Sequence, residues 1–224
     1  MEKYVIDKTT LTGIGDAIRE KEGTTAGIDP IDMKARIQAI AGGGETKPNY
    51  EKAIVERTIT EYSNDNITKI GICAFEECKA LTSVDFPNVT SSGGHAFYGC
   101  EALTSVNIPN ATSLGNYAFE ECRALTSVDF PNVTSIGSYA FRYCEALTSV
   151  NIPNVTSIGS YAFRGCEVLS YIDFSGCAAV PTLANVNAFQ SVPTTCKFRV
   201  PTALLNNWKA ATNWSTYAAQ IVGV

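Results

Sequence analysis

The residues of this chain that could carry out chemistry are eight cysteines, a single histidine and several adjacent glutamates. Zinc sites use cysteine and histidine ligands in close clusters, typically about two to four residues apart. The shortest cysteine spacing here separates Cys73 from Cys78, and His95 is the only histidine, so multi-histidine metal sites are excluded. No nucleophile motif accompanies His95, as a catalytic triad would need. We therefore expect no metal site, no cofactor and no enzymatic activity.

Most of the cysteines follow one another at intervals of 22 residues. The regular positions are Cys78, Cys100, Cys122, Cys144 and Cys166. A buried cysteine packs as a small apolar residue, so these five are expected to point inward as structural thiols. Metal or disulfide chemistry stays open as an alternative, chiefly for Cys177 and Cys196, which leave the regular spacing.

The remaining candidates for acid–base chemistry recur with the same period. The pair Glu76-Glu77 returns as Glu120-Glu121, 44 residues later, which favours a solvated turn over a catalytic pair. His95 occupies a position that later repeats fill with tyrosine. That column reads His95, Tyr117, Tyr139 and Tyr161. It predicts a packing position for the histidine at the edge of the structure.

Composition excludes two further classes of protein. The chain of 224 residues has 17 basic and 22 acidic residues and a formal net charge of -5. A nucleic-acid binder needs a basic face, so we expect no nucleic-acid partner. No segment approaches the ~20 apolar residues of a membrane-spanning helix, and no apolar run follows residues 1–8, so neither membrane insertion nor a signal peptide is expected. We expect synthesis in the cytoplasm, with a phage virion or a cell surface open as the final location.

The element that positions these residues is an internal repeat. Ala-Phe pairs begin at Ala74, Ala96, Ala118, Ala140 and Ala162. Between them, Val84 and Phe86 alternate with Ser83 and Asp85, as in a strand with one buried face, and Pro87 ends the strand. A 22-residue turn buries its apolar side chains only by stacking on its neighbours, which predicts a solenoid with parallel strands about 4.8 Å apart.

The repeats also alternate in pairs, which suggests a duplicated unit of 44 residues. The outward strand column reads Asp85, Asn107, Asp129, Asn151 and Asp173. Stacked carboxylates would repel each other, and the intervening asparagines separate them. A second column alternates in sign, as Lys79, Glu101, Arg123 and Glu145. We expect these charges to favour the correct register of the stack.

The segment Ile136–Pro153 has the sequence Ile-Gly-x-x-Ala-Phe-x-x-Cys-x-x-Leu-Thr-Ser-Val-x-Ile-Pro. This motif and its copies resemble the BspA-type bacterial leucine-rich repeat family, over residues 54–224. The resemblance implies an α/β repeat solenoid with parallel strands on its concave face, and a C-terminal helical cap. The expected flanking elements are a strand at 54–62, a partial repeat at 67–75, a distorted repeat at 180–189, a strand at 197–201 and a helical segment at 202–217. Trp208 and Trp214 are expected to cover the open end of the stack.

Residues 1–41 have a different character and predict a small helical segment, with Asp29 and Pro30 at the start of its second helix. Glycine-rich residues 42–49 predict a linker, which leaves 50–224 as the solenoid. The first segment resembles a leader of phage and prophage tail-associated proteins of gut bacteria. It differs from secreted BspA-type proteins, which carry export signals. The resemblance implies docking to a larger assembly.

A repeat surface of this kind predicts a binding protein. The candidate ligand contacts on the strands are Ser83, Asp85, Ser105, Asn107, Ser127, Asp129, Ser149, Asn151, Tyr171 and Asp173. Repeats differ most after the Ala-Phe pair, where Tyr98, Arg142, Tyr143 and Arg164 are the candidates. We expect a non-enzymatic module that recognises a protein or glycan on a cell surface, as a phage tail-associated protein or an adhesin. The alternative is a structural spacer or intracellular scaffold without a ligand.

Overall fold

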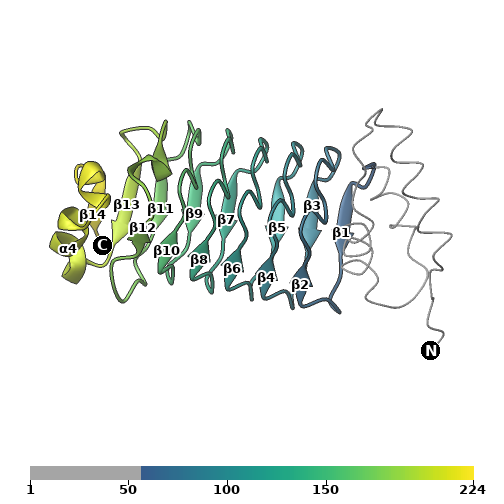
Figure 1. Ribbon diagram of the computed structural model, residues 1–224, viewed down its shortest axis with the longest axis horizontal. Helices are drawn as coiled ribbons and strands as arrows, with labels where there is room; N and C mark the ends of the chain where they lie inside the picture. The colour runs from purple at the N-terminus through teal and green to yellow at the C-terminus, as the bar shows by residue number, and fades with distance from the viewer. Residues whose placement is uncertain (1–56) are drawn as a thin grey trace.

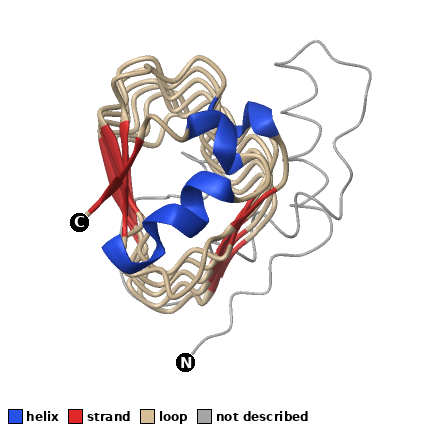
Figure 2. Cartoon of the chain, turned by 90° about the vertical axis from the view of Figure 1, so that its left-hand side faces the viewer, coloured by secondary structure: helices blue, strands red, loops and turns tan. Residues whose placement is uncertain are grey.

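The computed structural model describes residues 57–224, and the predicted helical segment and linker at residues 1–49 lie outside them. The described chain winds into a stack of short turns that succeed one another along one axis (Figure 1). Each turn contributes one strand to each of two sides, and loops join the sides (Figure 2). The predicted parallel-strand solenoid is confirmed.

The first side is made of the strands that the apolar alternation predicted, together with β14, and residues 57–60 of the strand expected at 54–62 are not in a strand. Their bounds are β1 Glu61–Ser63, β3 Ser83–Asp85, β5 Ser105–Asn107, β7 Ser127–Asp129, β9 Ser149–Asn151, β11 Tyr171–Asp173, β13 Lys197–Val200 and β14 Ile221–Gly223. All pair in parallel, and Val84 lies opposite Val106, one repeat away. These strands form two sheets, β1-β3-β5 and β7-β9-β11-β13-β14, with no backbone ladder between β5 and β7.

The second side is a continuous six-stranded sheet that the sequence analysis missed. Its two-residue strands are β2 Lys69–Ile70, β4 Ser91–Ser92, β6 Ser113–Leu114, β8 Ser135–Ile136, β10 Ser157–Ile158 and β12 Thr182–Leu183. Two residues are too few to show an alternating pattern, so the sequence indicated only a polar turn there. Threonines reinforce the stack: both the amide and the hydroxyl of Thr112 donate to the carbonyl oxygen of Thr90.

Each turn contributes an equivalent set of apolar side chains to the interior between the two sides. The phenylalanines of the Ala-Phe pairs stack as a ladder, with Phe119 centred 5.1 Å from Phe97 and 5.4 Å from Phe141. Glycine follows five of the six two-residue strands, all but β12, because successive turns approach closely there. A Cβ atom on Gly93 would lie 2.6 Å from the backbone nitrogen of Ile72, a separation that packed atoms do not tolerate.

The C-terminal end is covered by short helices. These are η1 Val186–Phe189, η2 Thr202–Leu204, α4 Leu205–Ala210 and η3 Trp214–Tyr217. Trp208 and Trp214 are fully buried, and the Trp214 indole donates to the Pro181 carbonyl oxygen, which confirms the predicted cap. The helical segment is not continuous, because Asn213 adopts a left-handed backbone (φ 65°) between α4 and η3. Strand β14, which pairs with β13, was also missed. No helix within residues 57–224 is long and apolar enough to span a membrane.

Candidate functional site

The cysteine ladder is a packing feature. Cys100 is fully buried, and its thiol donates to the carbonyl oxygen of Phe75 at 3.0 Å. The same contact recurs from Cys122 to Phe97, from Cys144 to Phe119 and from Cys166 to Phe141. Burial raises the pKa of these thiols well above the ordinary value. Because a neutral thiol is a poor metal ligand and a poor nucleophile, the geometry supports the interpretation as structural thiols.

The two cysteines outside the regular spacing have the same character. Cys177 and Cys196 are buried thiols, neither of them in a disulfide. Burial raises the pKa of Cys177 to about 11 and that of Cys196 to about 12. Across residues 57–224, no group of three histidine, cysteine or acidic side chains is arranged to hold a metal ion.

The tyrosine column forms a stacked aromatic ladder on the outside of the Ala-Phe turns. The ring of His95 lies 4.6 Å from that of Tyr117, Tyr117 lies 4.8 Å from Tyr139, and Tyr139 lies 5.1 Å from Tyr161. The packing role predicted for His95 is confirmed. All four residues adopt left-handed backbone angles, with φ between 54° and 61°. The stacking of the rings stabilises the fold and offsets the cost of that unfavourable backbone conformation.

The four variable candidates lie beside this ladder. We call Tyr98, Arg142, Tyr143 and Arg164, together with the ladder, the turn ridge. The guanidinium carbon of Arg142 lies 5.1 Å from the ring centre of Tyr139 and 4.9 Å from that of Tyr143. That of Arg164 lies 6.0 Å from Tyr143 and 5.6 Å from Tyr161. The structure thus brings three of the predicted residues into one cation–aromatic strip.

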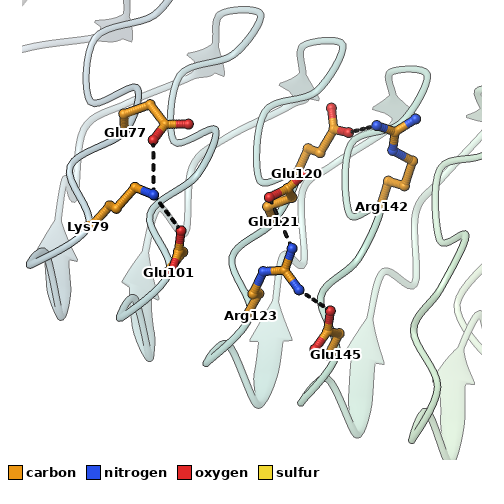
Figure 3. Close-up of polar contacts among 8 residues, drawn as sticks. All are labelled: Glu77, Lys79, Glu101, Glu120, Glu121, Arg123, Arg142 and Glu145. Atoms are coloured by element: carbon orange, nitrogen blue, oxygen red, sulfur yellow. Dashed lines mark hydrogen bonds and ion pairs between the residues drawn. The ribbon is translucent and has the colours of Figure 1, made fainter. Parts of the chain in front are cut away.

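Beneath this strip, Arg142 forms an ion pair with Glu120 from the preceding turn (Figure 3). Glu120 is only 1% exposed, although the same position in an earlier repeat, Glu76, is half-buried. Burial raises the pKa of Glu120, and the attraction of Arg142 only partly opposes this rise. The expectation of a solvated glutamate pair is therefore wrong for Glu120, because its carboxylate is buried and paired with the side chain of Arg142.

The sign-alternating column forms the expected ion pairs at the surface. Lys79 contacts Glu101 at 2.8 Å, and Arg123 contacts Glu145 (Figure 3). Lys79 lowers the pKa of Glu101 through a hydrogen bond and its charge. Both pairs join an odd-numbered repeat to the next even-numbered one, as a 44-residue unit would require. Solvent screens such exposed pairs, so they fix the register of the turns more than they stabilise the fold.

The outward side chains of the first-side strands form what we call the strand face, and its asparagines bond to aspartates of the preceding turn. The Asn107 amide donates to the Asp85 carboxylate at 2.7 Å, and the Asn151 amide donates to Asp129 at 2.7 Å. The asparagines therefore do more than separate the carboxylates. This regular surface ends at Tyr171, whose ring lies 3.9 Å from the guanidinium carbon of Arg199.

Several residues of these contacts were not among the sequence candidates. They are Glu120, Tyr139, Tyr161 and Arg199. The 22-residue tyrosine column could have indicated two of them, since equivalent residues of a stacked repeat lie side by side. The contacts of the arginines depend on side-chain directions, which the sequence does not give.

The comparisons with known proteins agree with this architecture. The sequence model of the BspA type leucine-rich repeat region matches residues 57–170 in six copies. The chain belongs to this family. No relative was found among curated proteins. A leucine-rich repeat protein from Bacteroides ovatus shares 27% identity over 66% of this chain and 41% of its own, with a TM-score of 0.53.

Two further solved structures are similar to this chain. The pneumococcal vaccine antigen PcpA matches 74% of this chain and 42% of its own at 16% identity, with a TM-score of 0.60, which supports the fold. A leucine-rich cell-surface protein from Faecalibacterium prausnitzii shares 29% identity over 63% of this chain and 48% of its own, with a TM-score of 0.49. The BspA-type chain described here thus spans less than half the length of each of these three proteins.

Proposed function

We propose that the chain is a non-enzymatic binding module that recognises a protein or glycan on a cell surface through the turn ridge. The observation that carries this proposal is the cation–aromatic strip of Arg142, Tyr143 and Arg164. Arginine and tyrosine are among the side chains that contribute most energy to protein interfaces. Because stacking fixes them in the unbound chain, less conformational entropy is lost on binding.

The side chain of Tyr143 gives this strip further support. Tyr143 has a left-handed backbone with φ 60°, and its equivalents in the other repeats, Glu77, Gly99, Glu121 and Gly165, also have positive φ. The conformation is therefore a feature of the repeat. What distinguishes Tyr143 is its aromatic ring beside two arginines, which supports a contact role for that ring.

The strand face carries the remaining sequence candidates and is the alternative contact surface. Its serines and its Asp–Asn pairs repeat along the stack, and uniform groups offer little specificity. Tyr171 is its most distinctive candidate, since it interrupts the serine column beside Arg199. A spacer without a ligand is the alternative that this uniformity favours.

Residues 1–41 complete the proposal. They dock the solenoid to a larger assembly, in the manner of a phage or prophage tail-associated protein or of an adhesin. The basis is the resemblance of this segment to tail-associated leaders, together with its difference in composition from the repeats. Deleting residues 1–41 should leave ligand binding by the solenoid intact and abolish co-purification with such an assembly.

The binding role is tested by co-sedimentation of the full chain with isolated bacterial cell walls. Two variants copy residues that the repeats themselves use: Tyr143→Gly copies Gly165, and Tyr171→Ser copies Ser149. We expect the wild-type chain to sediment with the cell walls. Tyr143→Gly should bind at least about tenfold more weakly, and Tyr171→Ser should bind as the wild type does. Wild-type chain that stays in solution would favour the spacer, and selective loss in Tyr171→Ser would move the site to the strand face.

A further inference from the structure

The turn ridge contains two arginines, and only one of them has its charge balanced by the protein. Arg142 forms an ion pair with the buried carboxylate of Glu120. Arg164, one turn later, takes part in no ion pair within residues 57–224, and its nearest described partners are the rings of Tyr143 and Tyr161. The position after it in the stack is occupied by Gln190, so no carboxylate follows along this column.

The surroundings of Arg164 leave its N–H groups available. A Cβ atom on Gly165 would lie 2.5 Å from the Tyr143 ring, so a side chain there would displace the tyrosine that stacks near the guanidinium. On the other side, the Tyr161 hydroxyl accepts a hydrogen bond from the Asn187 amide at 3.3 Å. Its own proton therefore remains free to be donated outward.

The charge of the solenoid is also unevenly distributed along its axis. Residues 57–136 contain four basic and nine acidic side chains, whereas residues 137–224 contain five basic and three acidic ones. An anion is thus repelled from the first part and attracted to the second, where Arg164 lies. Glu120, the buried carboxylate beneath the strip, is already paired with Arg142.

From these observations we propose that Arg164, with Tyr143 and Tyr161, is the subsite for a carboxylate group of an acidic polysaccharide. This inference rests on the proposed binding function and names the chemistry of its ligand. A guanidinium held beside aromatic rings, with no carboxylate partner of its own, can make a bidentate contact with the carboxylate of a ligand. The Tyr161 hydroxyl supplies an additional donor for a sugar hydroxyl or for the same carboxylate.

A polysaccharide suits this surface better than an acidic peptide does. The ridge repeats its donors once per turn, about every 4.8 Å. An extended peptide laid along the axis would present side chains on one face about every 6.8 Å, out of step with the turns. A glycan carries hydroxyl groups on all sides of every sugar ring, so it can contact each turn of the ridge without a matching register.

The test uses the full chain and isothermal titration calorimetry with two carboxylated glycans, polygalacturonate and polysialic acid. Neutral galactan and polyglutamate are the comparison ligands. We expect at least one carboxylated glycan to bind and galactan to bind at least about tenfold more weakly, since a charge-assisted hydrogen bond is lost. Arg164→Gln, which copies Gln190 of the next turn, should weaken glycan binding to a similar extent. Arg164→Lys should restore only part of it, because a lysine makes no bidentate contact.

The matched control is Arg123→Gln, an arginine whose charge is balanced by Glu121 and Glu145. It should bind as the wild type does. The inference is overturned if neither carboxylated glycan binds, if Arg164→Gln binds them unchanged, or if polyglutamate binds more tightly than both. Cell-wall binding that persists in any of these cases would leave the broader binding function standing and show that its ligand has another chemistry.

Discussion

The strand face and the turn ridge come from the same 22-residue repeat, yet they satisfy their polar groups in different ways. On the strand face, Asn107 and Asn151 donate to the carboxylates one turn before them. On the turn ridge, Arg164 has aromatic neighbours and no carboxylate partner within the described chain. The regular Asp–Asn alternation pairs an amide with a carboxylate of the preceding turn, whereas Arg164, which departs from the repeat, is left for a ligand to use.

The apolar packing also differs between the turn ridge and the strand face. Beneath the turn ridge the phenylalanine ladder continues from Phe75 to Phe189 without interruption. On the strand face, the ladder of backbone hydrogen bonds is broken between β5 and β7, and Val106 of β5 is only partly buried. The ridge is therefore held by a more continuous core than the strand face is.

The largest expected effect tests this difference in packing. Phe119→Ala removes a fully buried ring from the middle of the ladder and should destabilise the fold by about 3–5 kcal/mol. Val106→Ala, at the broken part of the strand face, should cost about 1 kcal/mol, because less apolar surface is lost. Urea denaturation followed by circular dichroism measures both. Equal losses would show that the two sides are held equally and would contradict the comparison.

Much of this fold could be predicted because the same sequence pattern occurs in five repeats. The alternation around Val84 is short, but its copies fix the strand, its burial and its parallel partner. The break at Asn213 could not be predicted, since it depends on one residue in a left-handed conformation within a segment that occurs once. The two-residue strands such as β4 were missed for lack of any alternation.

The candidate site was predictable only in part. Variation after the Ala-Phe pair identified Arg142, Tyr143 and Arg164, which the structure brings together. The buried state of Glu120 was not predictable, because its sequence neighbourhood matches that of Glu76 and the difference arises from an arginine 22 residues later. Contacts between turns thus decide the electrostatics that each turn's own sequence leaves open.

A smaller effect separates the buried ion pair of the ridge from the exposed pairs near it. Burial raises the pKa of Glu120 above its unfolded value, so the folded chain binds the proton more tightly. The contribution of Glu120 to stability is therefore greatest at low pH and falls as pH rises from about 4.5 through the raised pKa. Glu120→Gln should remove this fall, which thermal unfolding from pH 4 to pH 8 would detect as a difference from the wild type.

Glu101 provides the control of opposite sign. Its pKa is lowered by Lys79, so its contribution is present above the unfolded pKa and is lost as pH falls through the lowered one. Glu101→Gln should therefore remove a gain of stability with rising pH. If Glu120→Gln and Glu101→Gln changed the pH dependence of stability in the same direction, the assignment of one ion pair as buried and the other as exposed would be contradicted.

The smallest effect concerns the strand face alone. Asn151→Asp would set three carboxylates in a row, between Asp129 and Asp173, where an amide now donates to Asp129 at 2.7 Å. Like charges directly opposite on neighbouring strands are unfavourable, so we expect a loss of about 0.5 kcal/mol that shrinks in high salt, where surface charges are screened. Thermal unfolding at low and high ionic strength measures it, with Asp129→Asn as the variant that removes the charge instead. Because Asn151 and Asp129 already bond to each other, cell-wall binding through the turn ridge should not change in either variant. A loss of binding without a loss of stability would show that the Asp–Asn pairs serve a ligand, and the contrast between the two surfaces would fail at the point where the repeats are most alike.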